Sequence, residues 1–487
     1  MRISSIIPCV RNANGSGHEQ RRQTDGSGKD EVNRMNDFRK TAQEMLEFIR
    51  ISPTCFHAVA NIGRMLEAAG FQQLQEKEEW KLEKGGRYYT ERNDSSVIAF
   101  VIPEKEVGIR GFHMAAAHSD SPCFKIKEKP ELTVEEHYLR LNTEKYGGMI
   151  LSTWLDRPLS IAGRLAVKNG NGIEGRLVNI DRDLCVIPNV AIHMNREMNK
   201  GVEYNPQVDL LPLLADVSFD EYDTHTTYDA QTASENAEEQ PETVEKPTLA
   251  ALAAEAAGVD AETILGEDLF LYTRQEGKMI GAKGEFVLSP RLDDLQSAFA
   301  LTKAFTESTP AEYINLCAVF DNEEVGSGTR QGADSTFLED TLQRITEGLQ
   351  EGHSTYLRWV ADSFLISADN AHAVHPNHPE KADPANRPYL NGGIVIKYHG
   401  SQKYTTDGIS AAKMKDYCER AKVPYQTYAN RSDIAGGSTL GNISTAHVSV
   451  SSVDIGLPQL AMHSAVETAG MKDTEYAVRA LKEFWGE

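Results

Sequence analysis

The sequence lacks closely spaced cysteines, long apolar runs and a surplus of basic residues. Its six cysteines lie far apart without any Cys-x-x-Cys pair, and several, such as Cys317, fall inside apolar runs. This spacing argues against a disulfide framework and indicates buried, reduced thiols, as in cytoplasmic proteins. No apolar run approaches the length of a membrane span, and the N-terminus does not resemble a signal peptide. We therefore expect a cytoplasmic protein.

Basic side chains are scarce, because 50 Lys and Arg stand against 72 Asp and Glu, which gives a formal net charge of −22. A surface with this charge repels phosphate backbones and anionic lipid headgroups. We therefore expect neither nucleic acid nor a membrane surface as a partner.

With 487 residues, the chain is long enough for two or three folding units, or for one large domain that carries an inserted one. Residues 1–34 lack periodicity, and we expect them to form a disordered tail. Beyond them, the pattern predicts strands at 96–103, 112–120, 314–324, 363–371 and 393–399, and helices at 292–305, 410–422 and 474–486. Because these strands are apolar along their whole length, the fold predicted is α/β, a three-layer sandwich with a mixed, largely parallel sheet.

The middle of the chain has a different pattern. Between about residues 127 and 215, short alternating segments are separated by Gly and Asn, which indicates a separate small β-rich domain. A strongly acidic stretch at about 216–247 follows it. We interpret this stretch as a solvated loop or linker rather than as an acidic binding tail.

Polar clusters follow several predicted strands where the apolar run ends, and open α/β sheets place their ligand sites at such strand ends. In the first cluster, Asp120 lies two residues after His118 on an extended chain. Both side chains then project from the same face, so the carboxylate can orient the imidazole toward a metal. A His-x-Asp pair alone is more often an ordinary surface or core histidine.

The second cluster is the pair Glu323 and Glu324, which follows an apolar strand and precedes glycines that permit a sharp turn. Adjacent carboxylates repel, so such a pair in a cleft needs a cation or protons. One glutamate can bind a metal while the other takes a proton from water. The alternative for an isolated pair is a solvated loop.

Three later segments add further candidates. Asp369 stands at a strand end, and we assign the following His372 a supporting or substrate-facing role, because prolines interrupt any helix that would align the nearby histidines. Asp293 precedes a predicted helix, where a carboxylate on its own is expected as an N-terminal cap. His463 follows a late apolar run.

Together, these segments supply two imidazoles and three carboxylates, from His118, Asp293, Glu324, Asp369 and His463. Such a set suits two cations that share one carboxylate and a bridging water whose pKa falls toward neutrality, with Glu323 left over as a base. Oxygen and nitrogen ligands without thiolate favour zinc, manganese or cobalt in an open catalytic site.

From about Met35 to the C-terminus, the sequence resembles the M18 metallopeptidases, the aspartyl aminopeptidase family. The resemblance rests on seven segments in the family's order: AAAHSDSPCFKIK, YGGMILSTWLDRPLSIAGR, SPRLDDLQSAF, VFDNEEVGSGTRQGA, SADNAHAVHPNHPEK, IVIKYHGSQKYTTDG and PQLAMHSAVETAG. A chance match to all seven is not credible.

The resemblance implies a metalloaminopeptidase that uses two divalent metal ions to remove the N-terminal residue of peptides. Zinc is the metal expected first, with manganese or cobalt as alternatives. One metal would be held by His118, Asp293 and Asp369, and the other by Asp293, Glu324 and His463. Asp293 would bridge the two metals, and Asp120 would orient His118. Glu323 would be the general base that deprotonates the bridging water.

The resemblance also implies an architecture and a specificity. A β-rich dimerisation domain at 127–271 would be inserted into a catalytic domain of residues 35–126 and 272–487, and dimers would assemble into a dodecamer. His193 of this insertion would reach the neighbouring subunit's site. Lys397 matches a position that contacts acidic substrate side chains, which favours N-terminal Asp or Glu. The acidic stretch departs from the compact pattern expected of the insertion.

Three alternatives remain at this stage. The first is an aminopeptidase of the same fold with neutral or basic preference, and the second is a related two-metal amide hydrolase that does not need a free amine. The third is a catalytically silent shell protein. Glu323 argues against a silent shell, because a scaffold has no need of an unpaired base beside a metal ligand.

Overall fold

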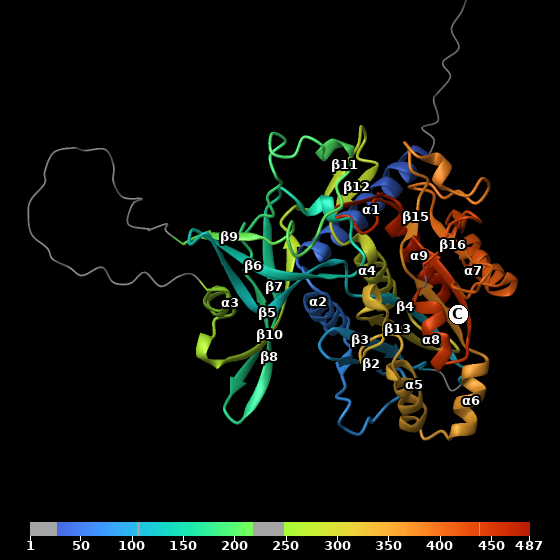
Figure 1. The fold of residues 1–487 in the computed structure, drawn as a ribbon. Helices are drawn as coiled ribbons and strands as arrows, with labels where there is room; N and C mark the ends of the chain where they lie inside the picture. Colours follow the sequence, from blue (N-terminus) through green and yellow to red (C-terminus); the bar gives the residue numbers. More distant parts are fainter. Residues whose placement is uncertain (1–26, 105–107, 218–247, 438) are drawn as a thin grey trace, which may run out of the picture.

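The computed structural model describes residues 27–104, 108–217, 248–437 and 439–487. They form a mixed α/β fold with three sheets (Figure 1). The α/β class predicted from the sequence is therefore confirmed. Residues 1–26 of the predicted tail and 218–247 of the predicted acidic loop lie outside the described residues.

The first helix begins inside the segment that was predicted to be a tail. Helix α1 spans Ser27–Arg50, whereas the tail was expected to continue to residue 34. Residues 29–50 contain neither Gly nor Pro, so no residue in them interrupts the helix. The helix therefore includes residues 27–34 of the segment predicted as a tail.

The largest sheet has nine strands in the order β1-β2-β3-β13-β4-β14-β18-β16-β17. Strands β13, β4, β14 and β18 are parallel neighbours, and β3 and β16 flank this group in the antiparallel direction. The strand bounds are β1 Gln72–Gln73, β2 Arg87–Arg92, β3 Ser96–Val101, β4 Phe112–His118, β13 Ile314–Phe320, β14 Phe364–Ala368, β16 Ile394–Tyr398, β17 Tyr425–Ala429 and β18 Ser451–Gly456. All five strands predicted from apolar runs are present in this sheet.

Helices cover both faces of the large sheet. On β4, Ala115 and Ala117 pack into the core shared with α1, α2, α4, α7 and α9, whereas Met114 and Ala116 pack into the core shared with α5, α6 and α8. Alternate residues of one strand thus face opposite helical layers, as a continuously apolar strand requires. The remaining helix bounds are α2 Cys55–Ala68, α4 Leu292–Thr306, α5 Phe337–Gly348, α6 His353–Ala361, α7 Gly408–Ala421, α8 Leu440–His447 and α9 Asp473–Trp485.

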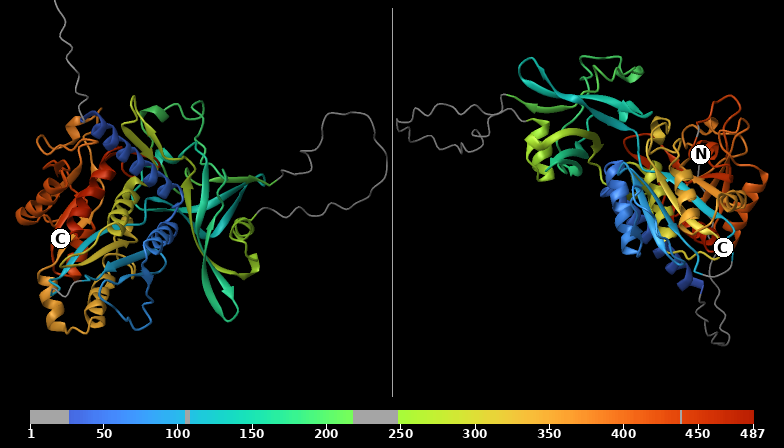
Figure 2. Two further views of the ribbon diagram at one scale, coloured as in Figure 1. Left: turned by 180° about the vertical axis from the view of Figure 1, so that it is seen from behind. Right: turned by 90° about the horizontal axis from the view of Figure 1, so that it is seen from below.

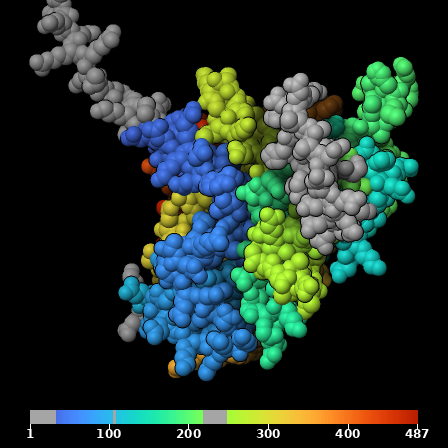
Figure 3. Space-filling model, turned by 90° about the vertical axis from the view of Figure 1, so that its left-hand side faces the viewer, coloured from blue at the N-terminus to red at the C-terminus, as the bar shows by residue number. Residues whose placement is uncertain are grey.

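A second unit is built from one stretch of the chain and lies beside the first (Figure 2). Its six-stranded antiparallel sheet has the order β8-β7-β10-β5-β6-β9. The bounds are β5 Cys123–Val134, β6 Tyr138–Tyr146, β7 Leu159–Asn169, β8 Gly172–Asn179, β9 Leu213–Asp216 and β10 Ile264–Thr273, with helix α3 at Leu249–Ala257. Figure 3 shows the N-terminal helices in blue against this unit in green, and Phe56 of α2 packs on Phe270 of β10 there.

The predicted start of the β-rich segment can be compared with the strand bounds. A boundary at residue 127 would cut through β5, which is one continuous strand from Cys123. Residues 123–126 pair with β6 in the same ladder as the rest of the strand, so backbone hydrogen bonding places them in the second unit. Strand β5 therefore begins four residues before the predicted boundary.

A third, five-stranded sheet has the order β11-β12-β20-β19-β15. Its strands are β11 Lys278–Ile280, β12 Phe286–Ser289, β15 Ala371–His372, β19 Pro458–Leu460 and β20 Glu467–Gly470. It connects segments that are far apart in the sequence and that flank several candidate site residues.

Two expectations about the chain's environment can be compared with the structure. All five cysteines in the described ranges have free thiols, and four of them are buried, as predicted. Among the helices that the structure describes, none has both the length and the apolar character needed to cross a bilayer.

Candidate metal centre

Three neighbouring strands end at the same edge of the nine-stranded sheet and deliver most of the candidate ligands. Strand β4 ends at His118, β14 ends just before Asp369, and β13 is followed by the short 3-10 helix Glu323–Val325. Because β13 and β14 flank β4 in parallel, their carboxyl ends meet where open α/β sheets bind ligands.

The other two candidate ligands lie beside the five-stranded sheet, one at the start of a helix and one in a loop. Asp293 stands at the start of α4, shortly after β12, and His463 lies between β19 and β20. Strands β12 and β20 pair antiparallel, with Ser289 opposite Glu467. This pairing brings two segments together that are about 170 residues apart in the sequence.

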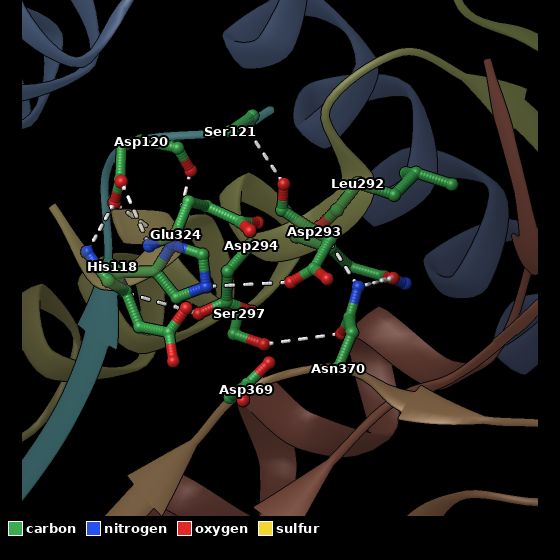
Figure 4. A network of polar contacts seen from close by, with 12 residues as sticks. His118, Asp120, Ser121, Leu292, Asp293, Asp294, Ser297, Glu324, Asp369 and Asn370 are labelled. Atoms are coloured by element: carbon green, nitrogen blue, oxygen red, sulfur yellow. Dashed lines mark hydrogen bonds and ion pairs between the residues drawn. The ribbon is translucent and has the colours of Figure 1, made fainter. Parts of the chain in front are cut away.

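The side chains from these five segments converge. Figure 4 shows His118, Asp293, Glu324 and Asp369 around one centre. His118 Nε2 lies 3.5 Å from Asp293 Oδ1. His463 Nε2 lies 3.5 Å from Asp293 Oδ2 and 3.4 Å from Glu324 Oε1. The Asp293 carboxylate therefore lies between the two imidazoles.

Several carboxylate oxygens at this centre have no hydrogen-bond partner among the described residues. They are Asp293 Oδ1, Asp294 Oδ1 and Glu324 Oε1, and all three are buried. Buried carboxylate oxygens without hydrogen bonds are strongly unfavourable unless protons, a neighbouring imidazolium or a metal cation compensate their charge. Imidazole nitrogens and carboxylate oxygens are also the ligands of catalytic zinc sites, so these residues fit a divalent cation.

The ligand atoms fall into groups whose members lie within 4.8 Å of one another. The groups are His118 with Asp293, Asp294 and Asp369; Asp293 with Glu324 and His463; and His118 with Glu323 and Glu324. Asp293 is common to the first two groups. The geometry is thus compatible with two cations on either side of one carboxylate.

Asp120 fixes both the first histidine and the turn that carries the two glutamates. Its Oδ1 lies 3.3 Å from His118 Nδ1, and its two oxygens accept the backbone N–H groups of Glu323 and Glu324 at 3.2 Å each. Tyr146, at the end of β6 in the second unit, donates its hydroxyl to Asp120 at 2.7 Å. Because Nδ1 is engaged in this way, His118 presents Nε2 to the centre.

Burial and mutual repulsion change the proton affinities of the acids and histidines. Burial raises the pKa of Glu323 to about 7, with Asp369 and Asp120 adding to the rise and His118 opposing it. Burial also raises the pKa of Glu324 well above its ordinary value. Burial by itself lowers the pKa of His463, but Asp293 and Glu324 raise it to about 10. The centre therefore favours positive charge, as protons or as cations.

Sequence reasoning did not assign a role to three groups that complete the centre. Asp294 is fully buried, and its Oδ2 accepts the backbone N–H of His118 at 3.2 Å. The Gly148 carbonyl, from the second unit, accepts a hydrogen bond from His463 Nδ1 at 2.8 Å. Glu467 accepts backbone N–H groups from both Asp293 and His463. Of these three groups, only Asp294 could be noticed in the sequence, because it is adjacent to Asp293. The roles of Gly148 and Glu467 depend on tertiary packing.

The three remaining predicted site residues have different surroundings. Lys397 on β16 is buried, and its Nζ lies 3.5 Å from Asp369 Oδ2. His372 lines a cavity of about 440 Å³ that also includes Ala461, two residues before His463. His193 is exposed in the loop between β8 and β9. No contact in the described part of the chain joins His193 to the centre of its own subunit.

Comparison with known proteins now identifies the family. The family model described as "Aminopeptidase I zinc metalloprotease (M18)" matches residues 48–485. The chain belongs to the M18 family. This M18 protein is accordingly a metallopeptidase hydrolase of the aminopeptidase class, as the sequence motifs predicted.

Individual relatives of this M18 aminopeptidase agree over nearly the whole chain. A probable M18 family aminopeptidase 2 of Clostridium novyi (strain NT) is 46% identical over 448 residues, which cover 92% of this chain and 98% of that protein. The cryo-EM structure of the Ape4 and Nbr1 complex matches with a TM-score of 0.84 at 36% identity, over 93% of this chain and 86% of that chain. The S. cerevisiae mApe1 dodecamer matches with a TM-score of 0.76 at 26% identity, over 92% and 96% of the two chains.

Metal binding should stabilise the fold through Asp293. For the wild-type protein stripped with a chelator, we expect zinc at 1,000 times its Kd to add about 4 kcal/mol per site to the free energy of unfolding. Asp293→Asn should lose most of this gain, because both ligand groups lose a charged oxygen. Chemical denaturation with and without zinc measures the difference. Asp473→Asn, at a buried aspartate outside the centre, should retain the gain; retention in Asp293→Asn would contradict the assignment.

Proposed function

We propose that this M18 protein is a two-metal aminopeptidase that removes N-terminal residues, with acidic residues preferred, from peptides. The observation that carries the proposal is the position of Asp293, shared between one group with His118 and Asp369 and another with Glu324 and His463. Two divalent cations in these groups, zinc or else manganese or cobalt, would polarise the scissile carbonyl and lower the pKa of the attacking water.

Glu323 is proposed as the general base. Its carboxylate belongs to the group with His118 and Glu324, and its backbone N–H is held by Asp120. A carboxylate beside a metal-bound water can accept a proton from that water and release it in a later step. Glu323 would therefore accept a proton from the attacking water and deliver it to the nitrogen of the leaving amine.

Replacing Glu323 by Gln should remove the base while leaving the metal ligands in place. We expect kcat on a peptide with a free N-terminus to fall about 10²- to 10⁴-fold, with little change in KM or in bound metal. Steady-state kinetics with metal analysis tests this. Glu91→Gln is a matched control, because burial also raises the pKa of Glu91 to about 7, on β2 and outside the metal-binding groups.

The rate at which the wild-type protein cleaves peptides in the same assay distinguishes an aminopeptidase from another amide hydrolase. An aminopeptidase should lose activity when the substrate's N-terminus is acetylated, whereas an amide hydrolase of another kind should not. If Glu323→Gln with its full metal content turned over peptides at the wild-type rate, Glu323 would not be the base.

The proposed preference for acidic N-terminal residues rests on positive charge beside the centre. The buried Lys397 supplies an ammonium group there, and its Nζ lies 3.5 Å from Asp369 Oδ2. The neighbouring cavity of about 440 Å³ is lined by further cationic or titratable groups, among them His372, Lys381 and Arg431. A substrate carboxylate in this region would form a charge-assisted pair. A neutral or basic preference is the alternative.

Lys397→Met tests the preference as a ratio. If Lys397 pairs with the substrate, kcat/KM for N-terminal Asp should fall about 10- to 100-fold more than kcat/KM for N-terminal Ala. If Lys397 serves only Asp369, both values should fall together and the ratio should stay constant. Lys413→Met, on α7, provides the control, since it should leave both values unchanged.

For architecture, we propose that the six-stranded unit is an inserted dimerisation domain on a three-layer catalytic domain, and that the chain assembles into a dodecamer in the cytoplasm. The solved mApe1 relative is a dodecamer. His193 lies between the exposed side chains of Ile192 and Met194, which are 45% and 83% accessible. Exposed apolar side chains of this kind suit burial against another subunit, so we propose that His193 enters the neighbouring subunit's site.

A further inference from the structure

Glu467 is a buried carboxylate that connects the two loops carrying Asp293 and His463. It is the first residue of β20 and is 2% accessible. Its Oε2 accepts the backbone N–H of Asp293 at 3.0 Å, and its Oε1 accepts the backbone N–H of His463 at 2.7 Å. One carboxylate thus holds the main chains of two residues that are far apart in the sequence.

The two residues held in this way are those whose side chains meet at the centre. His463 Nε2 lies 3.5 Å from Asp293 Oδ2. Glu467 itself is absent from the metal-binding groups formed by the described residues. Its two oxygens are instead engaged by main-chain donors, so its chemistry differs from that of the ligand carboxylates beside it.

The backbone at one of these two residues has an uncommon conformation. His463 has a φ of 66°, a left-handed conformation that is uncommon for a residue other than glycine. The pairing of Ser289 with Glu467 brings β12 and β20 into register just before Asp293. Glu467 stands at the end of that pairing. Its hydrogen bonds therefore fix the backbones of Asp293 and His463 relative to the sheet.

We propose that Glu467 is a positioning residue for metal binding: it sets the spacing between the backbones of Asp293 and His463, so that both side chains reach the same cation. The proposal takes these two residues as ligands, as in the proposed function. It assigns Glu467 a contact with neither substrate nor metal. Partners of this kind around metal ligands change metal affinity or activity by about 10- to 100-fold when they are replaced.

A carboxylate is required at this position for a chemical reason. Both groups that face Glu467 are N–H donors. A glutamine of the same shape would present its amide NH2 to one of them, so that one hydrogen bond would be lost. Glu467→Gln therefore loosens either the Asp293 loop or the His463 loop without changing any ligand.

Asp473 offers a closely matched control elsewhere in the molecule. It is also fully buried, and its two oxygens accept the backbone N–H groups of Gly393 at 2.9 Å and Asn391 at 2.7 Å. It is not a member of any metal-binding group in the described residues. Asp473→Asn removes the same kind of double acceptor, so it reports the general cost to the fold.

The experiment measures zinc affinity by competition with a chromogenic chelator, on full-length Glu467→Gln, Asp473→Asn and wild-type protein, together with Tm and kinetics. We expect both variants to lower Tm. Only Glu467→Gln should weaken zinc affinity, by about 10- to 100-fold, and excess zinc should restore kcat in part with KM unchanged. Glu467→Asp, which keeps both oxygens on a shorter side chain, should lose less affinity than Glu467→Gln.

Wild-type zinc affinity in Glu467→Gln, or an equal loss in Asp473→Asn, would overturn the positioning role. If Glu467→Gln does not fold, Glu467→Asp decides the matter, because unchanged zinc affinity in that variant would also overturn it. Failure of the proposed aminopeptidase function would be visible separately, since wild-type protein would then bind zinc but cleave no free N-terminus.

Discussion

The arrangement of this site depends on electrostatic repulsion among buried acids that are held close together. Asp293, Asp294 and Glu324 each carry a buried oxygen without a hydrogen-bond partner within the described structure, and burial raises the pKa of Asp294 and Glu324. The fold supplies the energy to hold them, and protons or a metal cation compensate their charge. We therefore expect metal binding to stabilise the fold.

The proposed ligands lie on or next to rigid strands and helices, and groups from all three sheets hold them in orientation. The parallel strands deliver His118 and Asp369, and the five-stranded sheet brings Asp293 and His463 together. The second unit contributes Tyr146, through Asp120, and the Gly148 carbonyl. The six-stranded unit thus has contacts with the centre of its own chain, in addition to the role in assembly that we propose for it.

Much of the candidate site could be predicted from the sequence, because apolar runs with polar ends mark buried parallel strands, and proposed ligands lie at those ends. His118, Glu324 and Asp369 follow this rule. Asp293 and His463 were proposed from their residue types and from the family motifs, since neither ends a strand of the large sheet. Glu467 and Gly148 could not be predicted, because their roles exist only through tertiary hydrogen bonds. The start of β5 at Cys123 was missed because strand pairing, not composition, defines it.

The central claim is that one carboxylate, that of Asp293, is shared by two metal sites. Anomalous diffraction from crystals of the zinc-loaded protein tests it most directly. Two peaks per chain are expected on either side of Asp293, one beside His118 and Asp369 and the other beside Glu324 and His463. A single peak that Asp293 does not contact, or full zinc loading with Asp293 bound to neither ion, would contradict it.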